Sequence, residues 1–211
     1  MNNLNFNLNR SLFEKKEYDS KYISTLQSLH HRFTEEGHYS CNIFNSNKLI
    51  KTFVIMVERD CKTLKNNFDI SEILRDKSDH YTVSINEYVG FYVSNGSLQV
   101  TITIYNTKDR KELAFDSSNL RMHDVFCASF LKPGKYIVEN KLISARMTVD
   151  VLPFDKRPVS PKKVEVLDKF DSDKVELMQT ETLFLIIKNE KDNQITIKYL
   201  GDGGKENELK Y

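Results

Sequence analysis

Alternating apolar and polar residues recur along this chain in short runs, and that period of two predicts β-strands. Runs of this kind lie at 50–57, 100–104, 147–152 and 195–199. Turn residues separate them. No run of 18 apolar residues occurs, so we expect no membrane-spanning segment. The pattern predicts an all-β protein.

The strand pattern occurs more than once, at a nearly constant spacing. Six positions have a matching residue 97 positions later. The pairs are Tyr18 and Phe115, Asp19 and Asp116, Ser20 and Ser117, Phe33 and Phe130, Gly37 and Gly134, and Tyr39 and Tyr136. The apolar positions within 83–93 also recur 94 residues later, at 177–187, except that Gln179 takes the place of Ile85. A fixed internal period is the signature of a repeat architecture. We therefore predict tandem β-sandwiches with a repeat of about 97 residues.

The repeat predicts a division of the chain in which both ends stop inside a unit. Residues 1–58 should form the back part of one β-sandwich and residues 59–152 a complete β-sandwich. Residues 153–161, with three of the four prolines, should form a linker, and residues 162–211 the front part of another β-sandwich. A partial sandwich exposes an apolar face and unpaired strand edges, which is unfavourable in water. We therefore expect the strands within 162–211 to join those within 18–58.

Seven apolar positions of the expected complete unit should face its core, because they fall on alternating or repeating positions. They are Phe91, Val93, Ile102, Ile104, Phe130, Tyr136 and Val149. The segment 70–74 fits a short helix and an edge strand equally well.

Parts of the chain resemble a cupredoxin-like domain. Residues 169–177, followed by an apolar strand that ends at Asn189, look like its front half, and 115–118 with 130–136 look like its back half. The resemblance implies a Greek-key β-sandwich. An immunoglobulin-like sandwich stays open as a rival, because Tyr39 lies two residues before Cys41, as in the corner of that fold.

The cupredoxin-like family binds copper with a cysteine, two histidines and usually a methionine. Where the resemblance places the first histidine, the complete unit has Gln99 or Leu98, and where it places the cysteine, the unit has Asn140. The resemblance is therefore to a form of the family that lacks the copper ligands.

One cluster of residues in the sequence resembles metal ligands. It contains His30, His38 and Cys41, together with His31. Adjacent histidines on a strand point to opposite faces, so at most one of His30 and His31 can share a site with Cys41. We expect hydrogen-bonded or exposed histidines and a buried cysteine here, with no metal and no cofactor.

The charge balance and the absence of known motifs exclude several classes of function. The 31 Lys and Arg residues nearly balance the 30 Asp and Glu residues, so no overall field attracts nucleic acid or an anionic membrane. The sequence contains no phosphate-binding glycine loop, no Gly-x-Ser-x-Gly elbow and no His-Glu-x-x-His motif. We expect no catalytic residues and no enzymatic activity.

The cysteines and the first residues bear on the compartment. Three widely spaced cysteines, Cys41, Cys61 and Cys127, fit reduced thiols better than a disulfide framework. The first residues lack the basic and apolar regions of a secretory signal. The sequence thus favours a cytoplasmic location, or an extracellular one if a leader has been trimmed.

Together these observations predict a non-catalytic structural or protein-interaction module. Its partner would be a protein, or a second copy bound through strand edges, with no nucleic acid and no membrane span. The alternative is a copper-binding or electron-transfer protein with a non-standard site around His30, His38 and Cys41.

Overall fold

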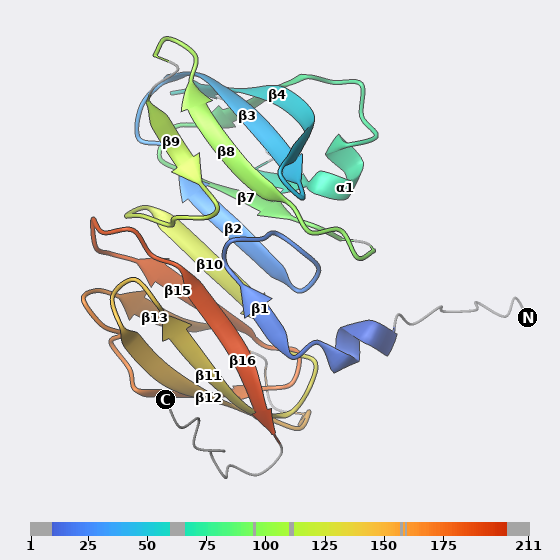
Figure 1. The fold of residues 1–211 in the computed structure, drawn as a ribbon, viewed down its shortest axis with the longest axis vertical. Coiled ribbons are helices and arrows are strands. Elements are labelled where there is room, and N and C mark those ends of the chain that lie inside the picture. The colour runs from blue at the N-terminus through green and yellow to red at the C-terminus, as the bar shows by residue number, and fades with distance from the viewer. Residues whose placement is uncertain are drawn as a thin grey trace, which may run out of the picture.

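The computed structural model describes residues 10–59, 66–94, 96–109, 112–156, 158 and 160–201. Nearly all of their regular structure is β-strand, which confirms the predicted class (Figure 1). One 3-10 turn, η1 (Arg10–Glu14), precedes the first described strand, and one helical turn, α1 (Ile70–Ile73), settles the segment for which helix and edge strand were both open. No described helix has the length and apolar character needed to cross a membrane.

The described residues contain sixteen strands. In chain order they are β1 (Glu17–Asp19), β2 (Gln27–Arg32), β3 (Gly37–Asn45), β4 (Lys48–Glu58), β5 (Asn67–Asp69), β6 (His80–Ser84), β7 (Tyr88–Tyr92), β8 (Thr101–Asn106), β9 (Leu113–Asp116), β10 (Asp124–Ser129), β11 (Gly134–Asn140), β12 (Ala145–Leu152), β13 (Lys162–Val166), β14 (Lys174–Met178), β15 (Thr182–Ile187) and β16 (Ile195–Gly201).

These strands form three sheets. The central sheet has six strands in the order β13-β15-β10-β2-β7-β5. Two five-stranded sheets flank it, one in the order β6-β4-β3-β8-β9 and the other in the order β1-β16-β11-β12-β14. In Figure 1 the first flanking sheet lies at the top and the second at the bottom, with β2 and β10 between them.

The repeat is visible as two copies that meet at the middle of the central sheet. We call residues 27–116 the first copy and residues 124–201 the second copy. Strands β2 and β10 pair antiparallel, with Leu29 directly opposite Phe126. Leu29 and Phe126 are 97 residues apart, so they are equivalent positions of the two copies, and they face each other in this ladder. A pseudo-two-fold axis therefore passes between these two residues.

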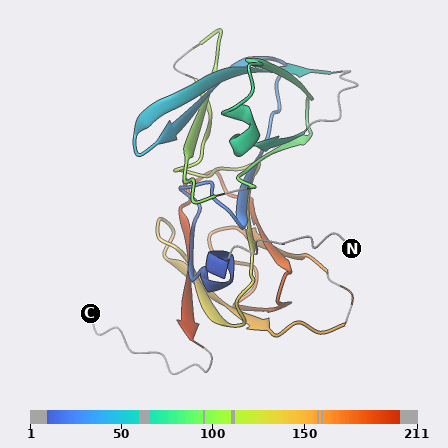
Figure 2. The same cartoon turned by 90° about the vertical axis from the view of Figure 1, so that its right-hand side faces the viewer.

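The resemblance to a cupredoxin-like domain is wrong, and independent tandem sandwiches are not what the chain forms. The central sheet runs without a break through both copies. The copies stack along the long axis and share that sheet, as the coils of a β-solenoid do (Figures 1 and 2). The resemblance rested on turn and strand residues such as Gly37 and Gly134, which many β-structures need wherever a strand begins after a tight turn.

The strand ladders also cross the predicted boundaries within the chain. Strands β3 and β4, which precede residue 59, pair with β8 and β6, which follow it. Strands β14 and β16 pair with β12 and β11 rather than with the strands of residues 37–58. In the flanking sheets, the expected joining of 162–211 to 18–58 is limited to β1, which pairs with β16. The reason is that, apart from the β2–β10 ladder between the copies, the strands of residues 27–116 and of residues 124–201 pair within their own copy, and a copy begins at β2 or β10.

The seven predicted core residues are all buried, with at most 3% of any of them exposed. They belong to one continuous hydrophobic core, but to two different copies of the repeat. Phe91, Val93, Ile102 and Ile104 belong to the first copy, whereas Phe130, Tyr136 and Val149 belong to the second. Alternation thus identified which side chains point inward, but not which strands they pack against.

Candidate interaction surface

The central sheet has one buried face and one face that neither flanking sheet covers. The buried face carries Leu29, Phe91, Phe126 and Leu185, which lie side by side in the ladders and are fully buried. Phe91 stacks there on Phe115 of a flanking sheet, with the ring centres 6.0 Å apart. Side chains alternate along a strand, so the residues between these point to the opposite side, which we call the open face.

A row of directly opposed residues crosses the open face from one copy to the other. In ladder order it consists of Asp69, Tyr92, Ser28, Cys127, Phe184 and Lys163. The row has polar or charged residues at its ends and aromatic residues on either side of its centre. Tyr92 is 37% exposed and the neighbouring Tyr88 is 41% exposed. Aromatic surface is therefore exposed on the Tyr92 side of the row.

A pocket of about 360 Å³ lies along this row. Ser28 and Cys127 lie at its centre, between Tyr92 on one side and Phe184 on the other. Ser129 and Thr182 add hydroxyl groups, whose oxygens are 2.8 Å apart. An apolar lining with a few hydroxyl groups suits an inserted apolar side chain that carries one polar atom.

Burial disfavours the charged forms of His30 and Cys127, two titratable residues that line this pocket. The imidazole Nε2 of His30 lies 3.1 Å from Ser28 Oγ, and burial lowers the pKa of His30. Burial also raises the pKa of the Cys127 thiol to about 12, despite an opposing hydrogen bond from Ser28. A thiol with so high a pKa is a poor nucleophile at neutral pH. The arrangement is suited to binding rather than to covalent chemistry.

A second polar cluster lies on the buried face, where the copies meet. His31 Nδ1 lies 2.6 Å from Asp124 Oδ1, and both residues are buried. The other carboxylate oxygen of Asp124 accepts a hydrogen bond from the backbone N–H of Arg121 at 2.8 Å. His31 also packs against Phe33 and Phe115, with ring centres 4.8 and 5.2 Å away. The His31 and Asp124 side chains thus link β2 of the first copy to β10 of the second copy.

We predict that Asp124 makes stability fall as the pH rises. Burial, only partly offset by His31, raises the pKa of the Asp124 carboxyl above its ordinary value of about 3.9. The folded state then binds more protons than the unfolded state between that value and the higher folded-state pKa. Stability from this group is complete below about pH 4 and is lost as the pH rises through the folded-state pKa.

The measurement is urea unfolding of the wild type and of Asp124→Asn at a series of pH values from about 4 upward. Asparagine keeps the shape of the side chain but cannot ionise. The wild type should lose stability relative to the variant as the pH rises. A constant difference between the two proteins would show that Asp124 does not titrate differently on folding.

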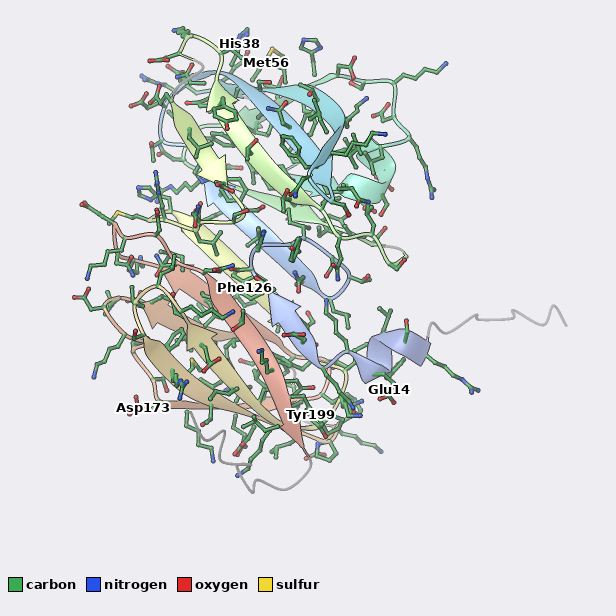
Figure 3. The ribbon with its side chains drawn as sticks, in the orientation of Figure 1. Glu14, His38, Met56, Phe126, Asp173 and Tyr199 are labelled. Atoms are coloured by element: carbon green, nitrogen blue, oxygen red, sulfur yellow. The ribbon has the colours of Figure 1, made fainter. Side chains whose placement is uncertain are left out.

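The structure separates the three residues that the sequence brought together as metal-ligand candidates. His38 is exposed on β3, opposite Met56 of β4, at the top of the molecule (Figure 3). Cys41 is fully buried in the core of the first copy, and burial raises its pKa strongly. His30 lies on the open face of the central sheet. No group of three or more His, Cys, Asp or Glu residues suited to a metal occurs among the described residues.

Sequence reasoning correctly placed His30 and His31 on opposite faces of a strand, and it expected Cys41 to be buried. It missed that Cys127 lies beside Ser28, and that Asp124 lies opposite His31. Both pairs come from the antiparallel ladder between the copies. The repeat offset reveals equivalent positions, but it carries no signal for which copies pair. Cys61 lies outside the described residues.

Comparison with known proteins gives no relative from which a function could be transferred. No family model, no curated protein and no solved structure matches this chain.

Proposed function

We propose that this protein is a non-catalytic structural or interaction module that binds a protein partner through the open face of its central sheet. The observation that carries the proposal is the row in which Tyr92 and Phe184 flank a pocket of about 360 Å³. Aromatic side chains beside a pocket are typical anchors of protein interfaces, because they bury a large apolar area with few rotatable bonds.

The edges of the central sheet favour binding at the face over strand addition. At one edge, β5 has only three residues and leads directly into α1. At the other edge, β13 exposes Lys162, Lys163 and Glu165. Short and charged edge strands discourage the addition of another strand. The open face is therefore the better docking surface of this sheet.

The test uses a variant of the half-exposed anchor. Replacing Tyr92 by lysine puts a charge beside the pocket, and Asp69 opposite it in the ladder can pair with that charge, so folding should be preserved. If Tyr92 is a hot spot, with about 2 kcal/mol or more at stake, affinity for a protein captured from native cell extract should fall about 30-fold or more.

A matched control places the same charge elsewhere. Leu142 is 52% exposed in the turn between β11 and β12, so Leu142→Lys adds lysine without touching the open face. Partners retained by the wild type and Leu142→Lys but lost by Tyr92→Lys would support the proposal. Equal retention by all three proteins would contradict it. A strong visible thiolate band on adding copper would instead support the copper-binding alternative.

A further inference from the structure

The second copy is completed by a strand that precedes the first copy in the chain. In the first copy, β9 follows β8 and pairs with it, placing Phe115 opposite Ile104. In the second copy the corresponding place beside β16 is taken by β1, which puts Tyr18 opposite Ile197. Tyr18 and Phe115 are the repeat-equivalent residues, at the offset of 97. Strand β1 is therefore the closing strand of the second copy.

The serine after each closing strand makes the same hydrogen bond in both copies. Ser20 Oγ accepts from the backbone N–H of Ile195 at 3.0 Å, and Ser117 Oγ accepts from that of Ile102 at 2.9 Å. Both serines are fully buried. The preceding aspartates match as well, since Asp19 and Asp116 each accept a hydrogen bond from the backbone N–H two residues later. The equivalence of β1 and β9 thus extends to individual atoms.

Two links carry the chain between the copies in opposite directions. Residues 20–26 run from β1 in the second copy to β2 in the first, and Ile23 pairs with Val100 on the way. Residues 117–123 run from β9 in the first copy to β10 in the second. Each link ends in a non-glycine residue with a positive φ, 67° at Leu26 and 79° at His123. For residues with a side chain, this conformation is strained.

The segment before Leu26 is held by contacts that a second molecule can equally supply. We call residues 10–25 the arm. Its ladder to β16 has only three residue pairs. Tyr18 inserts into the core and donates a hydrogen bond to the carbonyl of Ser129 at 2.9 Å. The backbone N–H of Tyr199 donates to the carbonyl of Lys16 at 2.8 Å. The first copy holds the arm as well: Ile23 is fully buried and pairs with Val100, and Ser117 Oγ donates to the carbonyl of Lys21 at 3.1 Å. A second molecule offers all of these groups.

We propose that the arm exchanges between two copies of this chain, so that β1 of each molecule closes the second copy of the other. Reciprocal exchange gives a closed dimer with two-fold symmetry in which every arm contact is kept. The hinge is Leu26, whose strained left-handed conformation is released when the arm extends toward the partner. Strained, short hinge segments favour this kind of exchange. The hinge residue Leu26 also lines the pocket of the open face, but Glu17 and Lys198, the positions used in the test below, do not line it, so the exchange is tested separately from the function proposed above.

The test traps the arm of one molecule on the strand of another. Glu17 and Lys198 are direct ladder partners with exposed side chains, so cysteines at these two positions can form a disulfide across the β1 and β16 ladder. Glu17→Cys and Lys198→Cys are made as separate proteins in a Cys61→Ser background, which leaves only the buried Cys41 and Cys127. The two are concentrated together under reducing conditions, oxidised and separated by mass.

Exchange predicts a disulfide-linked heterodimer that joins Glu17→Cys of one chain to Lys198→Cys of the other, with a yield that rises with concentration. The matched control is the internal closing strand, with Asp116→Cys mixed with Thr103→Cys, which are ladder partners in β9 and β8. That mixture should give no heterodimer. In the exchange mixture, Leu26→Gly should lower the heterodimer yield about fivefold, because glycine removes the strain of the closed form.

The double variant Glu17→Cys/Lys198→Cys shows whether the disulfide can form at all. If it forms within one chain while the mixture of single variants yields no heterodimer at any concentration, the proposal is overturned. A heterodimer in the control mixture that equals the one in the exchange mixture would overturn it as well, because it would indicate linkage without exchange of the arm.

Discussion

Replacing Tyr18 by alanine is expected to lower the free energy of unfolding by about 3–5 kcal/mol. The side chain is only 1% exposed and packs against Phe130, with the ring centres 5.2 Å apart. Its hydroxyl donates to the carbonyl of Ser129, and burial raises its pKa. Alanine therefore leaves a cavity and an unpaired buried carbonyl group at the same place. Urea unfolding measures the loss.

The control for this prediction is Tyr18→Phe, which keeps the ring and removes only the hydroxyl. Loss of one hydrogen bond should cost about 0.5–1.5 kcal/mol. The two variants thus separate the contribution of the buried ring to stability from the contribution of the hydrogen bond. If alanine proved no more destabilising than phenylalanine, the ring of Tyr18 would not be part of the core, and β1 would not close the second copy.

Replacing Phe126 by alanine is expected to destabilise both copies together, also by about 3–5 kcal/mol. Phe126 is fully buried and lies beside the pseudo-two-fold axis, near the centre of the molecule (Figure 3). Its strand pairs with β15 on one side and with β2 on the other. A cavity at this position weakens the β2–β10 ladder, which joins the copies, so neither copy should keep its full stability.

The measurement follows urea unfolding of Phe126→Ala by two probes, circular dichroism of the sheets and tyrosine fluorescence, since the chain has no tryptophan. Coincident transitions at lower urea than the wild type are expected, because one shared sheet makes unfolding cooperative. Tyr88→Ala, a change at an exposed position, should stay within about 0.5 kcal/mol of the wild type. Two separate unfolding transitions in the wild type would contradict the prediction that the two copies unfold cooperatively.

The sequence predicted local features of the fold well and their assembly poorly. Alternation correctly assigned inward residues such as Phe91 and Tyr136, because side-chain direction depends only on the period of a strand. The equivalence of Tyr18 and Phe115 was also visible in the sequence. What the period does not specify is the partner of each strand, since every copy offers compatible edges. The resemblance to a known sandwich was wrong for that reason, and the ladders of β3 and β4 cross the predicted division at residue 59.

The candidate surface was harder to predict than the core. Its central pair, Ser28 and Cys127, comes from strands about 100 residues apart that meet through the pseudo-two-fold axis. The metal-ligand candidates failed for the opposite reason. His38 and Cys41 are close in sequence, but an odd spacing along one strand sends their side chains to opposite faces, one exposed and one buried.

Amide hydrogen exchange of Tyr18→Ala and Phe115→Ala tests most directly the central claim, that β1 closes the second copy as β9 closes the first. The account predicts that Tyr18→Ala loses protection first in β16 and β11, whereas Phe115→Ala loses it first in β8 and β3. Loss of protection in β3 and β8 ahead of β11 and β16 in Tyr18→Ala would contradict it.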